Sequence, residues 1–287
     1  MTKIDRNFTP GGEWLYLKIY SGPMTLEQIL INELYPLITQ SLLSKTIDSF
    51  FFIRYTDSDY HIRLRFHSES PEKLMGLLLL LHPILDKYKK QFVISSIVVD
   101  TYCREIERYG EKHIVDVERL FFQDSILICS CLSHPKLQEQ DRWLVSCVFI
   151  DNFFNQCGFS LSDKIKFCER SSHSYNLEFF GSNVSFGDKQ WSKKYRNKRP
   201  EIQRALEGTF FDEDIDLLLN EFGNGTKNFT DSLCPISFEE DFQLLSSVIH
   251  MHVNRMFRTR QRLNECAIYN LLYRYYKSKK IILGQEQ

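Results

Sequence analysis

The sequence has no excess of charge of one sign, because its 287 residues carry 36 Lys and Arg against 37 Asp and Glu. With 43% hydrophobic residues, this balance excludes a disordered tail, a collagen-like fibre and a generic polybasic nucleic-acid binder. The composition therefore indicates an ordinary globular protein, and we expect no direct contact with nucleic acid.

There is also no segment that resembles a signal peptide or a membrane span. Residues 1–14 contain no apolar signal core, and the longest nearly uninterrupted apolar run, Leu74 to Leu81, is far too short to cross a bilayer. We therefore expect a cytoplasmic, soluble protein with no membrane span.

Motifs that hold metals, nucleotides or serine nucleophiles are missing as well. The eight cysteines are scattered without a Cys-x-x-Cys pair, and the sequence lacks His-Glu-x-x-His, the phosphate loop, the dinucleotide-binding glycine pattern and Gly-x-Ser-x-Gly. We expect no metal and no cofactor, and the default for the cysteines is reduced thiols in the core.

Extended patterns are concentrated in the first third of the chain. Aromatic and β-branched residues predict strands over Trp14–Tyr20 and Phe92–Asp100. Two further runs, Phe50–Tyr55 and Tyr60–Phe66, flank a Thr-Asp-Ser-Asp loop and predict a β-hairpin.

Helical spacing separates these strands and dominates the rest of the sequence. Thr25 and Gln28 fit a capping box at the start of one helix, Pro36 would kink or divide that helix, and Ser70 opens the next. Later helices are expected over 113–132, 139–156, 162–180, 189–206, 213–222 and, from a capping box of Ser237 and Glu240, 237–280, with loops at 181–187 and 223–235.

These patterns predict an α+β fold, with a mostly antiparallel sheet from the N-terminal third, many helices packed with it and a long C-terminal helix. No polar linker separates the two halves of the sequence. A single domain over residues 1–287 is therefore expected.

The sharpest local feature is a polar face on the strand that begins at Tyr60. Because successive side chains of a strand point to opposite faces, one face carries His61, Arg63, Arg65 and His67, with no acidic residue among them. A solvated outer face is the ordinary interpretation. The repeated arginine instead favours bidentate capture of a carboxylate or an enolate-like oxygen.

Two further segments carry candidate residues. Tyr102–Gly110 directly follows a predicted strand and could deliver Arg108 and Glu105 to the rim of a sheet, although a helix start with ion pairs explains it equally well. In the segment 246–257, His250 and Asn254 share a helix face whereas His252 does not, so the two histidines are poor joint metal ligands. A lone histidine in an apolar helix is more often a core residue, and only Asn254 and Arg255 weaken that interpretation.

Five sequence segments, in this order, resemble the C-terminal elimination domain of the lantibiotic dehydratases, also called the thiopeptide-type bacteriocin biosynthesis domain. The matching segments are Trp14–Tyr20, Phe51–Phe66, Thr101–Gly110, Glu118–Ser125 and Ile249–Arg255. The resemblance extends over most of the chain.

The resemblance implies a reaction. In such dehydratases one domain esterifies Ser or Thr of a precursor peptide with glutamate from glutamyl-tRNA, and a second eliminates the glutamate to leave dehydroalanine or dehydrobutyrine. This chain resembles the second domain alone, so we expect a free-standing lyase subunit. Its expected partners are a precursor peptide with leader and core, a separate glutamyl-tRNA-dependent glutamylating subunit and, in some pathways, a cyclase.

The same resemblance implies roles for individual residues. Arg65, Arg108 and His250 align with family residues required for elimination, the arginines for enolate and carboxylate stabilisation and the histidine for proton transfer. Arg63, His61, Glu105, Asn254 and Arg255 are the expected substrate-binding residues around them. Many relatives have a second glycine after Gly110, whereas Glu111 stands here and could pair with Arg108.

Two other functions stay open. A thiopeptide pyridine synthase, which joins two dehydroalanines in a formal cycloaddition, is an alternative enzyme with the same fold. A non-catalytic subunit could instead hold the precursor peptide or a partner by strand addition at the edge of the hairpin.

Overall fold

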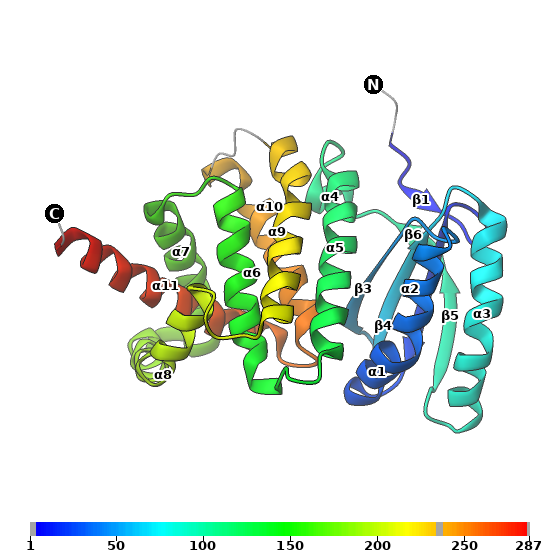
Figure 1. Ribbon diagram of the computed structural model, residues 1–287, viewed down its shortest axis with the longest axis horizontal. Coiled ribbons are helices and arrows are strands. Elements are labelled where there is room, and N and C mark those ends of the chain that lie inside the picture. Colours follow the sequence, from blue (N-terminus) through cyan, green and yellow to red (C-terminus); the bar gives the residue numbers. More distant parts are fainter. Residues whose placement is uncertain (1–3, 234–237, 286–287) are drawn as a thin grey trace. The chain divides into compact units, whose positions relative to one another are not determined.

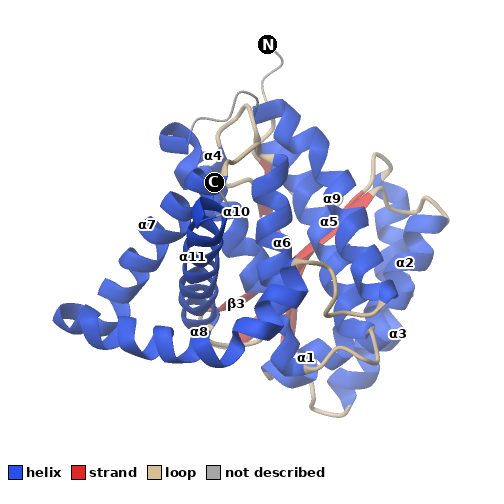
Figure 2. Ribbon diagram, turned by 60° about the vertical axis from the view of Figure 1, so that its left-hand side comes forward, coloured by secondary structure: helices blue, strands red, loops and turns tan. Residues whose placement is uncertain are grey.

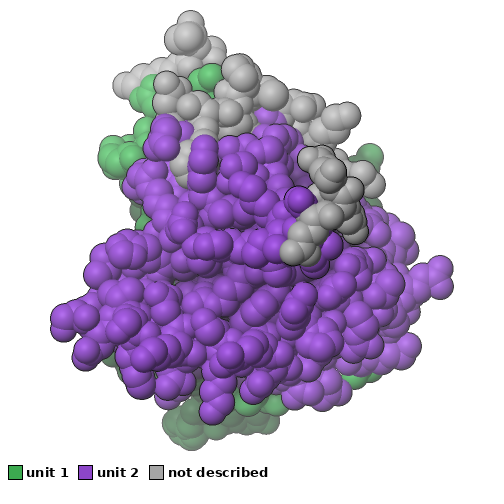
Figure 3. Space-filling model, turned by 90° about the vertical axis from the view of Figure 1, so that its left-hand side faces the viewer, with its two compact units in different colours: residues 1–135 green, residues 136–287 purple. Residues whose placement is uncertain are grey.

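The computed structural model describes residues 4–233 and 238–285. The chain divides into two compact units, unit 1 over residues 1–135 and unit 2 over residues 136–287, which are coloured separately in Figure 3. The expected single domain over 1–287 therefore stays a prediction, and each unit is described below by itself.

Unit 1 contains the β-structure (Figure 1). Its four-stranded sheet has the order β3-β4-β2-β5 and all of its neighbouring strands are antiparallel. The strands are β2 (Trp14–Tyr20), β3 (Ser49–Thr56), β4 (Tyr60–His67) and β5 (Ser96–Asp100), and a separate pair joins β1 (Asn7–Phe8) to β6 (Tyr102–Cys103). The predicted hairpin is confirmed as β3 and β4.

The sheet has two different faces. The helix-covered face carries the apolar residues of alternate positions, with Leu17 of β2 opposite Leu64 of β4, and both are fully buried. The Arg65 face carries the polar residues of β4 (His61, Arg63, Arg65, His67) and the residues opposite them. His61 and Arg65 are nevertheless buried, and Arg63 and His67 are half-buried, so the ordinary interpretation as a solvated outer face does not hold.

The helices of unit 1 are α1 (Pro23–Ile29), α2 (Tyr35–Leu43), α3 (Pro71–Lys90), α4 (Ile106–Tyr109) and α5 (Ile114–Ser133). Pro23 lies in the first turn of α1 and Gly22 is its N-cap, so the capping box expected at Thr25 is wrong. A π-helical segment, Leu30–Leu34, precedes Pro36 and divides the helix as expected. The strand expected from Phe92 begins only at Ser96, because Phe92 adopts a left-handed turn conformation (φ 58°).

Within its described residues, unit 2 consists of helices joined by loops and turns, without a β-strand (Figure 2). It contains α6 (Arg142–Gln156), α7 (Leu161–Phe180), α8 (Val184–Leu206), α9 (Glu213–Leu233), α10 (Phe238–Met256) and α11 (Gln261–Gln285), with 3-10 turns at Glu139–Asp141 and Gly181–Asn183. The loops expected at 181–187 and 223–235 are wrong over their described residues, which are mostly helical.

The long C-terminal pattern expected to form one helix forms two. The helix α10 ends at Met256 and α11 begins at Gln261, and Arg260 between them has a positive φ of 54°. The break contains no Gly or Pro that would have marked it in the sequence. Ser237 and Cys234 lie outside the described residues, and with them the second expected capping box.

The α+β fold class, with its antiparallel sheet near the N-terminus and a long C-terminal helix, is confirmed. All seven described cysteines are unpaired thiols, and only Cys103 is exposed. Burial raises the pKa of Cys131 to about 12, so this thiol stays protonated. None of the described helices combines the length and the apolar character needed to cross a membrane.

Candidate active site

Arg65 is a buried cation surrounded by aromatic rings on the Arg65 face. Its guanidinium carbon lies 4.5 Å from the ring centre of Tyr16, 5.1 Å from that of Phe51 and 5.0 Å from that of Tyr102. These three rings form the aromatic cage. Arg65 is only 6% exposed, and its Nε and Nη1 have no hydrogen-bond partner within the described residues. A buried, unpaired cation is costly, so the arrangement is suited to binding an anion.

Arg63 lies two residues away on the same face but is already engaged. Its Nε donates to Nε2 of His61 at 3.0 Å, and its guanidinium stacks on Tyr55, 3.6 Å from the ring centre. Because Nε2 accepts this bond, the ring proton of His61 is on Nδ1, which lies 3.1 Å from the carbonyl oxygen of Asp59. Burial lowers the pKa of His61 and favours this neutral form. Arg63 is thus held in place from both sides.

Neighbouring segments bring acidic residues to the Arg65 face that the strand itself lacks. Lys18, opposite Arg63, forms an ion pair with Asp100 of β5 at 2.5 Å, and hydrogen bonding to Lys18 lowers the pKa of Asp100. Asp57 and Asp48 lie 3.7 and 3.5 Å from His61 and His67 respectively. No ion pair of Arg65 occurs within the described residues, so Arg65 retains its charge for a ligand.

One ring of the aromatic cage is held by a buried polar network. The hydroxyl of Tyr102 donates to Glu118 Oε1 at 2.6 Å, and Arg104 binds both oxygens of Glu118 at 2.7 Å. Burial, and then the charge of Glu118, raise the pKa of Tyr102, so its hydroxyl stays protonated. This Tyr102–Glu118–Arg104 network fixes the ring that stacks on Arg65. It also shows that Arg104 pairs with Glu118 and not with Glu105.

Arg108 lies in the short helix α4 and is exposed. Its Nη1 forms an ion pair with Glu105 at 3.2 Å, as the helix-start interpretation predicted, and the described residues show no pair with Glu111. The adjacent Tyr109 is buried against Phe121, which in turn packs on Phe51 of the aromatic cage. Ring packing therefore ties the base of α4 to the surroundings of Arg65, while the side chain of Arg108 stays accessible.

In unit 2, His250 forms a pair with a buried acid that the sequence patterns did not reveal. Its Nδ1 lies 2.8 Å from Oε2 of Glu265, whose side chain is 2% exposed, whereas His250 is 26% exposed. An ionised carboxylate can only accept a hydrogen bond, so Nδ1 of His250 is the donor. The other ring nitrogen, Nε2, takes no part in this contact with Glu265. Burial, and then the charge of Glu265, raise the pKa of Tyr269, so this tyrosine stays neutral. The geometry suits a histidine that transfers protons through Nε2.

The other residues expected around His250 differ in burial. His252 is fully buried, lies 3.1 Å from the hydroxyl of Ser146 and stacks on Phe149, so it belongs to the core and is no joint metal ligand with His250. Asn254 is half-buried and Arg255 is fully buried. Their predicted contact with substrate stays a prediction.

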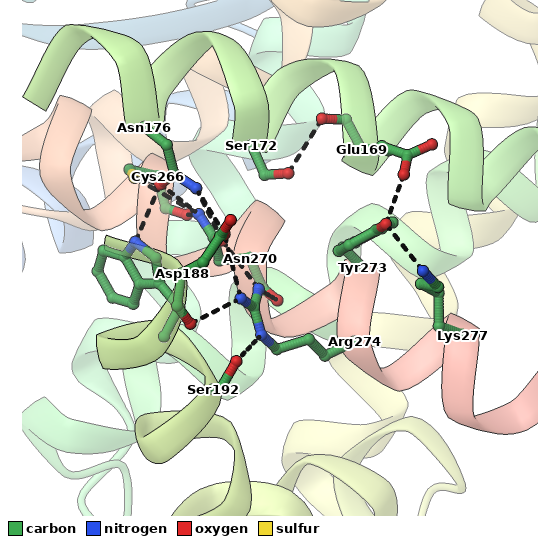
Figure 4. A network of polar contacts seen from close by, with 11 residues as sticks. Glu169, Ser172, Asn176, Asp188, Ser192, Cys266, Asn270, Tyr273, Arg274 and Lys277 are labelled. Atoms are coloured by element: carbon green, nitrogen blue, oxygen red, sulfur yellow. Dashed lines mark hydrogen bonds and ion pairs between the residues drawn. The ribbon is translucent and has the colours of Figure 1, made fainter. Parts of the chain in front are cut away.

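A polar network fixes the helix that carries Glu265 (Figure 4). On α11, Asn270 donates to Asn176 of α7 at 3.1 Å, and Arg274 binds the Asn270 side chain at 2.9 Å. Arg274 also reaches the carbonyl oxygen of Asp188 on α8 at 3.1 Å. Buried, mutually satisfied polar groups of this kind specify one packing of three helices. The position of Glu265 therefore follows from the packing of α11.

The expected site residues fall into both units. Unit 1 contains His61, Arg63 and Arg65 on one strand face, with Glu105 and Arg108 on and beside α4, and unit 2 contains His250, Asn254 and Arg255 on α10. Sequence patterns missed Glu265, Tyr102 and Glu118 as supporting residues. The sequence does contain one indication of Glu265: an acidic residue stands directly before the apolar run 266–269, and an acid is unusual on a buried helix face.

Comparison with known proteins finds relatives that are lantibiotic biosynthesis proteins. Subtilin biosynthesis protein SpaB of Bacillus subtilis is 25% identical over 269 residues, which are 90% of this chain and 25% of that protein. Nisin biosynthesis protein NisB of Lactococcus lactis subsp. lactis is 26% identical over 282 residues, 96% of this chain and 26% of that protein. The chain thus spans about a quarter of the length of these relatives.

Solved structures share the fold. The tRNA-dependent lantibiotic dehydratase MibB from Microbispora sp. 107891 superposes with a TM-score of 0.65 at 19% identity, covering 97% of this chain and 29% of MibB. TbtD, a pyridine synthase from thiomuracin biosynthesis, gives 0.61 at 12% identity, covering 92% of this chain and 99% of TbtD. The model of the lantibiotic biosynthesis dehydratase C-terminal family matches residues 14–276, and the chain belongs to this family.

Proposed function

We propose that this protein is a lyase that eliminates glutamate from glutamylated Ser or Thr residues of a ribosomally made precursor peptide. The single observation that carries the proposal is the buried, unpaired guanidinium of Arg65 inside an aromatic cage. Family membership and the 25–26% identity to SpaB and NisB support the same reaction class.

The reaction makes specific demands. A base removes the Cα proton of the esterified residue, the electron pair forms the Cα–Cβ double bond, and the Cβ–O bond breaks to release glutamate as its α-carboxylate, the carboxyl group that glutamyl-tRNA activates. Negative charge develops first on the amide carbonyl oxygen and then on the departing carboxylate. Fixed cations at both positions stabilise that charge, and one such group contributes on the order of 3 kcal/mol.

The residues of the site divide these tasks. Arg65 stabilises the enolate-like oxygen or the glutamate carboxylate from a buried position, where its charge acts more strongly than in water. Arg108 is accessible and pairs only with the exposed Glu105, so a carboxylate ligand can replace that pair. Arg63 assists Arg65 in binding the substrate. The buried, neutral His61 holds the Arg63 side chain in place and so acts on the substrate only through Arg63.

His250 transfers the proton in our proposal. Glu265 holds Nδ1 and thereby presents Nε2, in the same way that a buried acid orients a catalytic histidine in other enzymes. Whether His250 removes the Cα proton or protonates the leaving carboxylate is the detail that a pH–rate profile would decide. Asn254 and Arg255 on the same helix are proposed to assist substrate binding.

The proposed substrate defines the partners. The glutamylating activity must come from polypeptide outside residues 1–287, and we propose a separate glutamyl-tRNA-dependent subunit that shares the precursor peptide. A cyclase could use the dehydrated product. Strand addition at the hairpin is less favoured, since the edge strand β3 packs on α5, where Ser125 accepts a hydrogen bond from the backbone of Phe52.

The experiment is incubation of a glutamylated precursor peptide with the protein, followed by mass spectrometry. Loss of glutamate with formation of a dehydrated residue is the expected result. Intact glutamyl peptide would reject elimination. A macrocycle with loss of the leader, formed from a peptide with two dehydroalanines, would instead identify the pyridine synthase that the TbtD-like fold allows.

A variant separates catalysis from binding. Arg65→Ala should abolish turnover of the glutamylated peptide if the protein is the lyase. If it is a non-catalytic binding subunit, the same substitution would leave the pathway product largely unchanged.

A further inference from the structure

The three tryptophans of the chain differ in how their indole N–H groups are used. Trp143 donates to Asn264 at 2.8 Å and Trp191 donates to Asn176 at 3.0 Å. Trp14 is only 4% exposed, yet its Nε1 has no hydrogen-bond partner within the described residues. A buried donor without an acceptor is costly, so natural proteins rarely retain one without a reason.

Trp14 lies beside Arg65 on the same face of the sheet. It is opposite His67 in the register of β2 and β4, two positions along from the Tyr16–Arg65 pair and therefore the next pair on the same face. Its ring centre is 4.9 Å from that of Tyr102 and 5.8 Å from that of Phe51, two of the three rings of the aromatic cage. Two buried side chains with unpaired donors therefore share the same aromatic surroundings.

We propose that the indole N–H of Trp14 and the guanidinium of Arg65 bind the same anionic ligand group, a glutamate carboxylate of the glutamylated peptide. Indole N–H is a donor only, so its ligand must be an acceptor, and the neighbouring cation selects a negatively charged one. Trp14 and Arg65 are diagonal neighbours on adjacent strands, and such residues lie about 7–8 Å apart along the backbone, within reach of aromatic and long side chains.

This inference rests on the proposed function for the identity of the substrate but not for the existence of the anion site. Trp14 is the first residue of the segment Trp14–Tyr20, which resembles the dehydratase family. The proposal makes Trp14 a substrate-binding residue, with a donor that is specific to tryptophan and absent from phenylalanine.

The test is an indole ¹⁵N–¹H spectrum of the full chain during titration with L-glutamate, the released product. The resonance of Trp14, assigned by its loss in Trp14→Phe, is expected to shift saturably. The resonances of Trp143 and Trp191, which already have acceptors, should stay in place. Arg65→Ala should abolish the shift of Trp14. A Trp14 resonance that does not move at saturating glutamate, or one that still moves in Arg65→Ala, would overturn the proposal.

Turnover gives a second measurement. Trp14→Phe keeps a ring and removes the donor, and should lower kcat/KM for glutamate release about 10- to 100-fold, the worth of one hydrogen bond to a charged group. Phe8→Leu is the matched control, because Phe8 packs on both Trp14 and Tyr102 but offers no donor, and it should change turnover far less. Equal effects of the two substitutions would mean that only packing matters.

The two proposals can fail separately. A glutamate-induced shift of Trp14 in a protein that releases no glutamate from the peptide would support the anion site and reject the elimination. Release of glutamate with an unchanged Trp14 resonance would support the elimination and reject the role of Trp14.

Discussion

Two arginines on opposite faces of the same hairpin have opposite surroundings. Arg54 of β3 is fully buried on the helix-covered face, where its Nη2 forms an ion pair with Glu27 of α1 at 2.7 Å. Arg65 of β4 is nearly as buried on the other face, but aromatic rings surround it and no acid pairs with it in the described residues. Both positions exclude water, and only one supplies an internal anion.

The difference separates structure from function. A paired buried cation is already neutralised in the folded protein, and removing it leaves the charge of its partner uncompensated. An unpaired buried cation makes folding less favourable, and its charge is neutralised only when a ligand supplies a negative charge. The contrast assigns Arg54 to the fold and Arg65 to binding. Substitutions of these two arginines test the assignment, and substitutions of Glu265 and His61 extend the comparison to two other buried groups.

The largest effect is expected on stability, from Arg54→Met. It leaves the carboxylate of Glu27 buried without its cation and should lower the free energy of unfolding by about 3–5 kcal/mol, measured by urea denaturation. The double variant Arg54→Met with Glu27→Leu removes both charges and should recover most of that loss. A double variant no more stable than the single one would contradict a pairing role for Glu27.

Arg65→Lys should give the reverse result. It keeps the positive charge but loses the planar fork that matches a carboxylate, so transition-state stabilisation should fall by about 3 kcal/mol, seen as a loss of turnover in the glutamate-release assay. Its unfolding midpoint should change little. Arg54→Lys is the matched control and should retain turnover in the folded protein. Full activity of Arg65→Lys would show that the charge alone suffices.

Glu265→Gln tests a buried acid whose histidine partner, His250, is partly open to solvent. The amide is similar in shape but lacks the charge that holds Nδ1 of His250, so kcat should fall about 10- to 100-fold. KM should change much less, because Glu265 acts through His250 and makes no contact with substrate in our proposal. A change confined to KM would reject this positioning role.

The smallest effect concerns His61, which is buried, neutral and bonded to Arg63. Burial places its folded pKa below the unfolded value of about 6.5, so folding releases a proton and the unfolded state binds more protons at acid pH. Its stability contribution is complete above the unfolded pKa and declines as the pH falls through 6.5 towards the folded pKa. Between pH 7.5 and 5, the urea midpoint should therefore drop more in wild type than in His61→Gln, and equal drops would contradict this.

Much of the fold follows from local sequence patterns. Period-two alternation and turn residues located β2 and the β3–β4 hairpin, because each is specified by residues close in sequence. Patterns failed at the break between α10 and α11, where a left-handed Arg260 directly precedes α11, and at Phe92. Both side chains are exposed, and backbone hydrogen bonds such as Val93 N–H to the Tyr88 carbonyl close the turn at Phe92, so no side-chain pattern marked these positions.

The candidate site shows the same limit. The polar face of β4 and the positions of Arg65, Arg108 and His250 could be read from sequence alternation and family resemblance. Their partners could not, because Glu118 and Glu265 are 16 and 15 residues from Tyr102 and His250 and meet them only through packing.

The sequence by itself determined the fold class, the family and which side chains share a strand face, since these depend on periodicity and on motifs. Only the tertiary structure decided which of the charges are neutralised. Asp100 reaches Lys18, Glu27 reaches Arg54, and aromatic rings instead of an acid reach Arg65. Electrostatic energy depends on distance and burial in space, so the balanced total charge of the chain concealed that Arg65 is a buried cation without an acidic partner among the described residues.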